Sequence, residues 1–213
     1  MTNGRWIGIL FLVAIGCGAR MADPQYAEPA SGDLAVSYED SLKALFISNI
    51  PYLSEGFDYP VGKPDARHYY NAQAFGTNNH LGDDWNGRDG GNTDLGDPVY
   101  SISNGVVTQS VNFFGGWGKV VRIAHAWKEN DEMKMVESLY AHMDTMLVKK
   151  GQWLRKGDVI GKIGTAEGHY LAHLHLEIRD CAGMELGGGY SKNTIGFLDP
   201  TAFIKGHRSI ATN

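Results

Sequence analysis

The stretch His173–Arg179, HLHLEIR, alternates polar and apolar residues along its whole length. Because side chains on a β-strand point to opposite faces in turn, this stretch predicts a strand with His173 and His175 on one face. Glu177 and Arg179 continue the polar face, and the Leu and Ile residues between them are expected to pack on a core. Two imidazoles on one face can bind a metal, although an isolated His-x-His pattern is more often an exposed polar face.

The chain before this stretch consists, from about Val99 onward, of strand-forming runs separated by turn signals. Asn104-Gly105 is a strong turn signal that predicts a hairpin, and GQWLRKGDVIGKIG (151–164) has apolar residues at hairpin spacing. The expected strands are PVYSISNGVVTQSV (98–111), KVVRIAHAW (119–127) and MVESLYAHM (135–143). The predicted fold is all-β, with mostly antiparallel sheets and a short N-terminal helix.

The composition excludes some classes of partner. Hydrophobic residues make up 43% of the 213 residues, enough for one packed domain with a short appendage. The formal net charge of −5 argues against a nucleic-acid partner, since such binding depends on Lys and Arg meeting phosphates. The same charge argues against docking on anionic lipid by charge alone.

The N-terminal residues have the pattern of an export signal. Arg5 precedes the apolar run Trp6–Ile15, which is shorter than the roughly 20 residues that span a bilayer. Small residues then lead to Cys17, as in a bacterial lipobox. Residues 1–16 are therefore predicted to be a lipoprotein-type signal peptide with lipid on Cys17. Ordinary cleavage near Ala22 and an uncleaved anchor are the alternatives.

The remaining chain divides into three predicted parts. Residues 17–58 are expected to be a tether and N-terminal segment, residues 59–206 the functional domain, and residues 207–213 a C-terminal tail. Within the first part, Ser37 to Asp40 forms a weak capping box that predicts a helix near 38–48. The second cysteine is Cys181, and a disulfide with Cys17 is the alternative to lipid at that position.

His80 and Asp84 stand four residues apart in HLGDD. Gly82 between them disfavours a helix, so a loop or a strand end is expected there. Asp83 is a rival carboxylate that the spacing does not exclude. Two His and one Asp would form an N/O donor set suited to zinc, and three protein ligands leave a fourth position open, as in catalytic zinc sites.

His142 lies in YAHMD (140–144) and by alternation would share a strand face with Tyr140 and Ser138. A single strand histidine is usually structural, but histidines beside a metal can shuttle protons near neutral pH. His169 lies close to the HLHLEIR strand and could enter the same groove. Structural or surface roles are expected for His68, His125 and His207.

HLGDD, YAHMD and HLHLE occur in the order and rough spacing of the lysostaphin-like zinc endopeptidases. The segments DPVYSISNGVV (97–107) and GQWLRKGDVIGKIG also resemble that family, and the likeness extends from about Tyr59 to Ile204. The resemblance implies a lysostaphin-like metallopeptidase core.

This resemblance assigns roles to five residues. It implies that His80, Asp84 and His175 bind one Zn²⁺ per chain. It implies that His142 and His173 are catalytic beside the metal. Water would attack a peptide carbonyl, and one histidine would activate the water or hold the oxyanion while the other assists the departing amine; the sequence leaves open which does which.

The function implied is that of an exported zinc-dependent endopeptidase that hydrolyses peptide cross-links of bacterial peptidoglycan. A lipid on Cys17 would hold it in the cell envelope on the periplasmic face, and Gly18, where an inner-membrane lipoprotein often has Asp, favours the outer membrane. The alternatives are a catalytically inactive relative that regulates cell-wall amidases, a zinc peptidase that acts on proteins, and a carrier module suggested by KGDVIG (156–161). The oligomeric state, and whether residues 22–60 cover the groove, are left open.

Two segments depart from the family pattern. Leu171-Ala172 stands where the family usually has Gly-Pro, and WNGRDGGNTDLGD (85–97) is longer than the usual connection. Both are expected to shape the substrate groove. A calcium loop starting at Asp84 would need Asp or Asn at position 88 and Gly at position 89, where Arg88 and Asp89 stand, so a loop without calcium is favoured.

Overall fold

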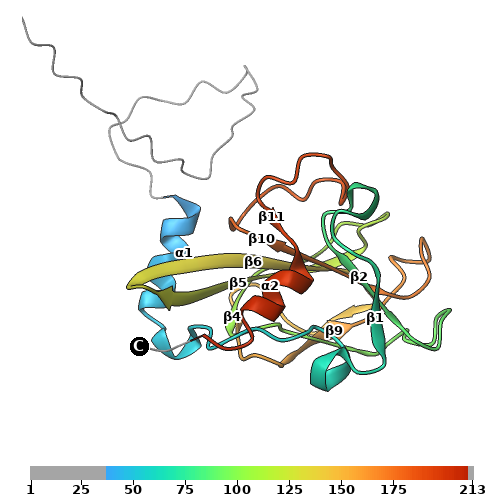
Figure 1. Cartoon of the computed structure of the whole chain (residues 1–213), viewed down its shortest axis with the longest axis horizontal. Helices are drawn as coiled ribbons and strands as arrows, with labels where there is room; N and C mark the ends of the chain where they lie inside the picture. The colour runs from blue at the N-terminus through green and yellow to red at the C-terminus, as the bar shows by residue number, and fades with distance from the viewer. Residues whose placement is uncertain (1–36, 211–213) are drawn as a thin grey trace, which may run out of the picture. The chain divides into compact units, whose positions relative to one another are not determined.

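The computed structural model describes residues 37–210 (Figure 1). The helices are α1 (Tyr38–Ile47) and α2 (Pro200–Gly206), and short helical turns lie at Ile50–Tyr52, Gly62–Ala66 and Thr77–Asn79. The strands are β1 (Tyr69–Gln73), β2 (Asp83–Gly87), β3 (Pro98–Tyr100), β4 (Gly105–Asn112), β5 (Lys119–Glu129), β6 (Glu132–Met143), β7 (Thr145–Met146), β8 (Trp153–Leu154), β9 (Val159–Lys162), β10 (Leu174–Arg179) and β11 (Phe197–Leu198). No helix within residues 37–210 is long and apolar enough to cross a bilayer.

The strands form two sheets in which every pair is antiparallel. The larger sheet has the order β1-β2-β10-β6-β5-β4-β8, with β11 paired to β10, and the smaller has the order β3-β9-β7. The prediction of mostly antiparallel sheets with a short N-terminal helix is confirmed.

The main hydrophobic core lies on one face of the larger sheet. On β10 the side chains of Leu174, Leu176 and Ile178 are fully buried in it, as the alternating pattern of HLHLEIR predicted. Val99 of β3 and Ile160 of β9 belong to the same cluster, so this core joins the two sheets. The polar residues of β10 therefore belong to the opposite face.

Helix α1 packs on that opposite face of the larger sheet, beside strands β4 and β5 (Figure 1). The hydroxyl oxygen of Ser37 accepts a hydrogen bond from the backbone N–H of Asp40 at 3.1 Å, which caps the helix as the sequence predicted. Leu42 and Phe46 carry the contact with the sheet, and the Phe46 ring lies 5.1 Å from that of Trp153.

The predicted hairpin at Asn104-Gly105 is wrong, because β3 belongs to the smaller sheet and β4 to the larger. The side chain of Asn104 donates to the carbonyl oxygen of Leu53 and accepts from the N–H of Lys156, both at 2.8 Å. A Cβ on Gly105 would lie 2.4 Å from the carbonyl oxygen of Ala124, so this glycine serves close approach to β5.

The segment 151–164 is not a hairpin either. Its strand β8 pairs with β4 in the larger sheet, whereas β9 pairs with β3 and β7 in the smaller one. The turn between them therefore connects the two sheets.

The segment around Phe57 packs against the C-terminal end of the described chain. The N–H of Phe57 donates to the carbonyl oxygen of His207 at 2.8 Å, and the N–H of Ile210 donates to that of Glu55 at 3.0 Å. Phe57 is fully buried in the main core. The described part of the segment placed before residue 59 therefore belongs to the same compact unit as the rest of the described chain. The predicted signal peptide and the lipid on Cys17 lie outside the described residues.

His125 of β5 is fully buried and neutral. Its Nδ1 donates to the carbonyl oxygen of Asn104 at 2.8 Å, and its Nε2 lies 2.8 Å from the hydroxyl of Ser138. Burial lowers the pKa of His125 to about 4 from 6.5.

We expect the free energy of unfolding to fall as the pH drops from about 6.5 to about 4, because the unfolded chain takes up the proton on residue 125 first. Protonation of His125 alone should account for about 3 kcal/mol of this loss in the free energy of unfolding. Urea unfolding of the wild type and His125→Gln across this range measures the effect, and the other titrating groups affect both proteins alike. The variant should be less stable at pH 7 but less sensitive to acid, and equal acid sensitivity would rule His125 out as the cause.

Candidate metal centre

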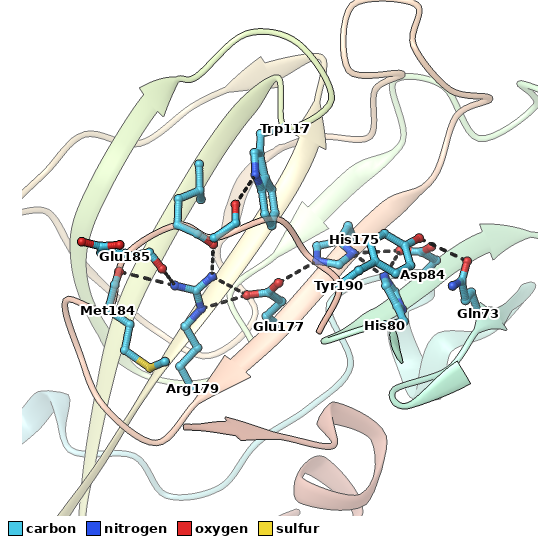
Figure 2. Close-up of polar contacts among 12 residues, drawn as sticks. Gln73, His80, Asp84, Trp117, His175, Glu177, Arg179, Met184, Glu185 and Tyr190 are labelled. Carbon is cyan, nitrogen blue, oxygen red and sulfur yellow. Dashed lines mark hydrogen bonds and ion pairs between the residues drawn. The ribbon is translucent and has the colours of Figure 1, made fainter. Parts of the chain in front are cut away.

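The structure brings His80, Asp84 and His175 together at one end of the larger sheet (Figure 2). Asp84 Oδ1 lies 2.9 Å from His175 Nδ1 and 3.4 Å from His80 Nε2, and the two nitrogens are 3.0 Å apart. Ligands about 2.0–2.1 Å from a tetrahedral zinc ion lie about 3.3 Å from one another. The three distances between these atoms thus agree, to within a few tenths of an ångström, with the distances expected between ligands of one zinc ion. Within residues 37–210 this is the one such group of His, Cys, Asp or Glu.

Strand pairing brings two of these side chains to the same place. β2 and β10 are antiparallel neighbours, and Asp84 stands directly opposite His175. His80 comes from the preceding turn, and Gly82 lets this segment approach β10. A Cβ on Gly82 would lie 2.4 Å from the carbonyl oxygen of Leu176 and 3.0 Å from Cε1 of His175. Gly82, which disfavoured a helix in the sequence, is therefore required because the two segments pack closely at this position.

Asp83, the rival carboxylate, points away from this cluster and is fully buried. Its carboxylate accepts hydrogen bonds from the N–H of Phe75 at 3.0 Å and from the hydroxyl of Thr201 at 2.6 Å. Neighbouring residues on β2 face opposite sides of the sheet, which separates the roles of Asp83 and Asp84.

Carboxylates on both sides of His175 favour a cation in the cluster. Burial alone would lower the pKa of His175, but hydrogen bonds with Asp84 and Glu177 raise it to about 9. Burial alone would raise the pKa of Asp84, but the hydrogen bond with His175 and the nearby histidine charges hold it below its usual value. Burial lowers the pKa of His80. A proton and a metal ion therefore compete for the same position.

His173 and His142 lie beside the cluster. His173 Nδ1 donates to the carbonyl oxygen of Leu171 at 2.8 Å, which leaves Nε2 as an acceptor 3.8 Å from Asp84 Oδ1. The ring of His142 lies 4.8 Å from that of His173 and 5.4 Å from that of His175. Burial lowers the pKa of His142 to about 3, and its buried Nδ1 has no partner in the described part of the chain. Both rings line the pocket and can therefore hydrogen-bond a bound molecule.

His142 does not share a face with Tyr140 and Ser138, so the prediction from alternation is wrong. Strand β6 gains one residue relative to β5 between Tyr140 and Met143, and His142 has a φ of +62°. Tyr140 and Ser138 bond to each other on the core face, whereas His142 turns to the face of His175. This β-bulge re-aims the side chain, as bulges next to functional sites often do.

The cluster opens into a pocket of about 420 Å³. Besides the five histidine and aspartate residues, its lining is Gln73, Gly116, Trp117, Tyr170, Gly188, Gly189 and Tyr190. No motif in the sequence predicted these residues, although glycine stands next to an aromatic residue in GGW (115–117) and GGGY (187–190). Neither His169 nor any residue of 37–60 lines the pocket, so the described part of the candidate inhibitory segment leaves it open.

The two departures from the family pattern contact each other. The side-chain oxygen of Asn92, in the 85–97 insert, accepts a hydrogen bond from the N–H of Ala172 at 2.8 Å. Ala172 is fully buried, and a proline at this position would have no N–H to satisfy. Within the described chain no residue of the insert lines the pocket, and the insert contacts the backbone that precedes His173 through its hydrogen bonds with Ala172.

Replacing Asn92 by Ala should lower the free energy of unfolding by about 1 kcal/mol, because the N–H of Ala172 loses its acceptor. In an Ala172→Pro background, Asn92→Ala should hardly change the free energy of unfolding, because residue 172 then has no N–H to donate. Urea unfolding of the two single variants and the double variant gives the interaction free energy. An equal cost of Asn92→Ala in both backgrounds would contradict this account of the insert.

The sequence of the chain matches a known protein family. The sequence profile of Peptidase family M23 matches residues 83–187. The chain is 36% identical over 84 residues to Lipoprotein NlpD of Yersinia enterocolitica, which covers 39% of this chain and 78% of that protein.

Two further relatives match over stretches of the same length. DD-carboxypeptidase/endopeptidase Mpg of Neisseria meningitidis is 37% identical over 84 residues, covering 39% of this chain and 17% of that protein. Murein hydrolase activator NlpD of Escherichia coli is 34% identical over 84 residues, covering 39% of this chain and 20% of that protein. The chain thus spans about a fifth of the length of these two proteins.

A solved structure has a similar fold. In the SpoIIQ–SpoIIIAH pore-forming complex, one chain matches with a TM-score of 0.50 and 18% identity, covering 73% of this chain and 94% of that chain. At this level of identity the match concerns the fold alone.

Proposed function

Because the chain belongs to Peptidase family M23, we propose that it is an exported zinc-dependent endopeptidase that hydrolyses peptide cross-links of bacterial peptidoglycan. The observation that carries the proposal is the His80, Asp84 and His175 cluster, which opens into a pocket beside two further histidines. The name of the relative Mpg, a DD-carboxypeptidase/endopeptidase, supports a wall peptide as substrate.

The donor set fits one Zn²⁺ per chain. Two imidazole nitrogens and one carboxylate oxygen lie at the spacing of tetrahedral ligands, and the pocket leaves a fourth position accessible. When bound, zinc would polarise a carbonyl oxygen and lower the pKa of water to about 7.

The remaining residues would orient the substrate and move protons. The acceptor Nε2 of His173 lies 3.8 Å from Asp84 Oδ1, so we assign it to take the proton from the attacking water. His142, held neutral by burial, would hydrogen-bond the carbonyl oxygen of the scissile peptide or the departing amine. The rings of Trp117, Tyr170 and Tyr190 form apolar walls along which a peptide could lie.

The proposed location is the cell envelope. Attachment of lipid to Cys17 would hold the enzyme on the periplasmic face, with outer-membrane placement favoured by Gly18. The printed name of the Yersinia relative, a lipoprotein, supports this proposal. An anchor of this kind would raise the effective concentration of enzyme near the wall without a separate binding domain.

A second candidate is a regulator of other wall hydrolases. The Escherichia coli relative NlpD is named a murein hydrolase activator, which favours this candidate. A regulator of this kind needs no bound metal, whereas the proposed peptidase depends on one. Zinc content and hydrolysis together separate the two functions.

We expect the zinc-loaded protein to cleave cross-linked muropeptides, with products identified by mass. Chelation should abolish the cleavage and added zinc should restore it, because the metal would act as the Lewis acid that polarises the peptide carbonyl. Stoichiometric zinc without cleavage of muropeptides, but with cleavage of denatured protein substrates, would favour a general zinc peptidase. Absence of both zinc and cleavage, with stimulation of an added amidase, would favour the regulator.

Substitutions should separate ligands from catalytic residues. Asp84→Ala and His175→Ala should lose zinc and activity together, because each removes a ligand. His142→Ala and His173→Ala should keep zinc but lose about 10²–10⁴-fold in turnover, the usual scale of general acid–base help.

The histidine outside the pocket provides the matched control. His169→Ala should change neither the zinc content nor the turnover, because this side chain bonds the carbonyl oxygen of Ala166 instead. Metal analysis and turnover of the variants test these assignments. Full zinc occupancy in Asp84→Ala or His175→Ala would refute the ligand roles. A near-normal turnover in His142→Ala or His173→Ala would exclude that histidine from the mechanism.

A further inference from the structure

A buried polar chain leads away from the metal-site histidine. His175 Nε2 lies 3.2 Å from Glu177 Oε1, and the other oxygen of Glu177 accepts from Arg179 Nε at 2.8 Å and Nη2 at 2.6 Å (Figure 2). The side chains of Glu177 and Arg179 are fully buried. Buried charges of this kind persist when each is paired and its remaining hydrogen-bonding groups are satisfied.

The other donors of Arg179 hold a loop. Nη1 donates to the carbonyl oxygen of Glu185 at 2.7 Å, and Nη2 donates to that of Leu186 at 2.8 Å (Figure 2). We name residues 184–190 the pocket strap, because its last three residues line the pocket. The planar guanidinium thus bonds Glu177 along one edge and the strap along another.

The far end of the strap meets the metal-site segment again. The N–H of Leu81 donates to the carbonyl oxygen of Gly189 at 2.9 Å, and His80 forms an isolated β-bridge with Tyr190. The rings of His80 and Tyr190 are 5.0 Å apart. The strap is therefore connected to His175 through Glu177 and Arg179, and directly to His80.

A second buried ion pair holds the same loop without touching the metal site. Arg122 pairs with Glu137, and its Nη1 donates to the carbonyl oxygen of Met184 at 2.8 Å. Glu137 also accepts from the N–H of Gly183 at 3.1 Å. This pair contacts none of the three proposed ligands, so it provides a control of similar burial and charge.

We propose that Glu177 and Arg179 are positioning residues that couple metal binding by His175 to the shape of the pocket strap. Glu177 orients the imidazole of His175 from behind, and Arg179 holds both Glu177 and the strap. A carboxylate behind a ligand histidine typically contributes about 10–100-fold to metal affinity. Because coupling is reciprocal, zinc should also stabilise the strap. The inference rests on the proposed zinc site.

The test measures zinc affinity and strap exchange in four full-length proteins. These are the wild type, Glu177→Gln, Arg179→Lys and Arg122→Lys. Competition with a chromophoric chelator gives the zinc dissociation constant, and hydrogen exchange with and without zinc gives the protection of residues 184–190. Neither readout depends on hydrolysis.

We expect Glu177→Gln and Arg179→Lys to weaken zinc binding by about tenfold or more and to reduce the protection that zinc gives the strap. Arg122→Lys should speed exchange near Met184 and leave the zinc affinity within about twofold of the wild type. If Arg179→Lys does not fold, Glu177→Gln, which conserves side-chain volume, decides the question.

Three outcomes are distinguishable. Wild-type zinc affinity and strap protection in Glu177→Gln would overturn the inference and leave the proposed peptidase intact. An equal loss of affinity in Arg122→Lys and Arg179→Lys would also overturn it, because general loosening of the loop would then explain both. Zinc-dependent protection without any peptide hydrolysis would support the inference and count against the proposed function.

Discussion

The pairing of β2 with β10 is the contact on which the rest of the site depends. It sets Asp84 opposite His175, so one register in the sheet decides whether a carboxylate and an imidazole can share an ion. A shift of β2 by one residue would send the Asp84 side chain into the core and bring Asp83 to the face that carries His175. Gly82 permits the close approach that this register requires. The geometry of the candidate metal site is therefore a property of the backbone pairing as much as of the side chains.

The two faces of the larger sheet have different roles. One face is apolar and is sealed against the smaller sheet. Along the other face lie α1, the Arg122–Glu137 pair, the Arg179–Glu177 pair and the histidine cluster. Charged groups buried along this second face are satisfied by one another and by loop carbonyl groups. The stability of the domain and the chemistry of the pocket thus depend on different sides of the same strands.

Sequence patterns within short segments correctly predicted the strand and the helix that those segments form. Alternation in HLHLEIR predicted both faces of β10, and the capping box at Ser37 predicted α1. Asn104-Gly105 misled because strand partners are chosen by long-range packing, and Asn104 serves three separate segments instead of a hairpin. The bulge at His142 and the pocket aromatics were missed because neither an extra residue in one strand nor a glycine-rich loop leaves a periodic pattern.

The carbonyl oxygen of Met184 accepts hydrogen bonds from both Arg122 and Arg179. This one atom thus fixes the start of the loop to two strands, β5 and β10, while the residues beyond Gly187 line the pocket. Insertions or deletions after that point would resize the entrance without disturbing the anchoring at Met184. Relatives with the same sheet could in this way diverge in the substrates they admit by changing only the length and side chains of this part of the loop.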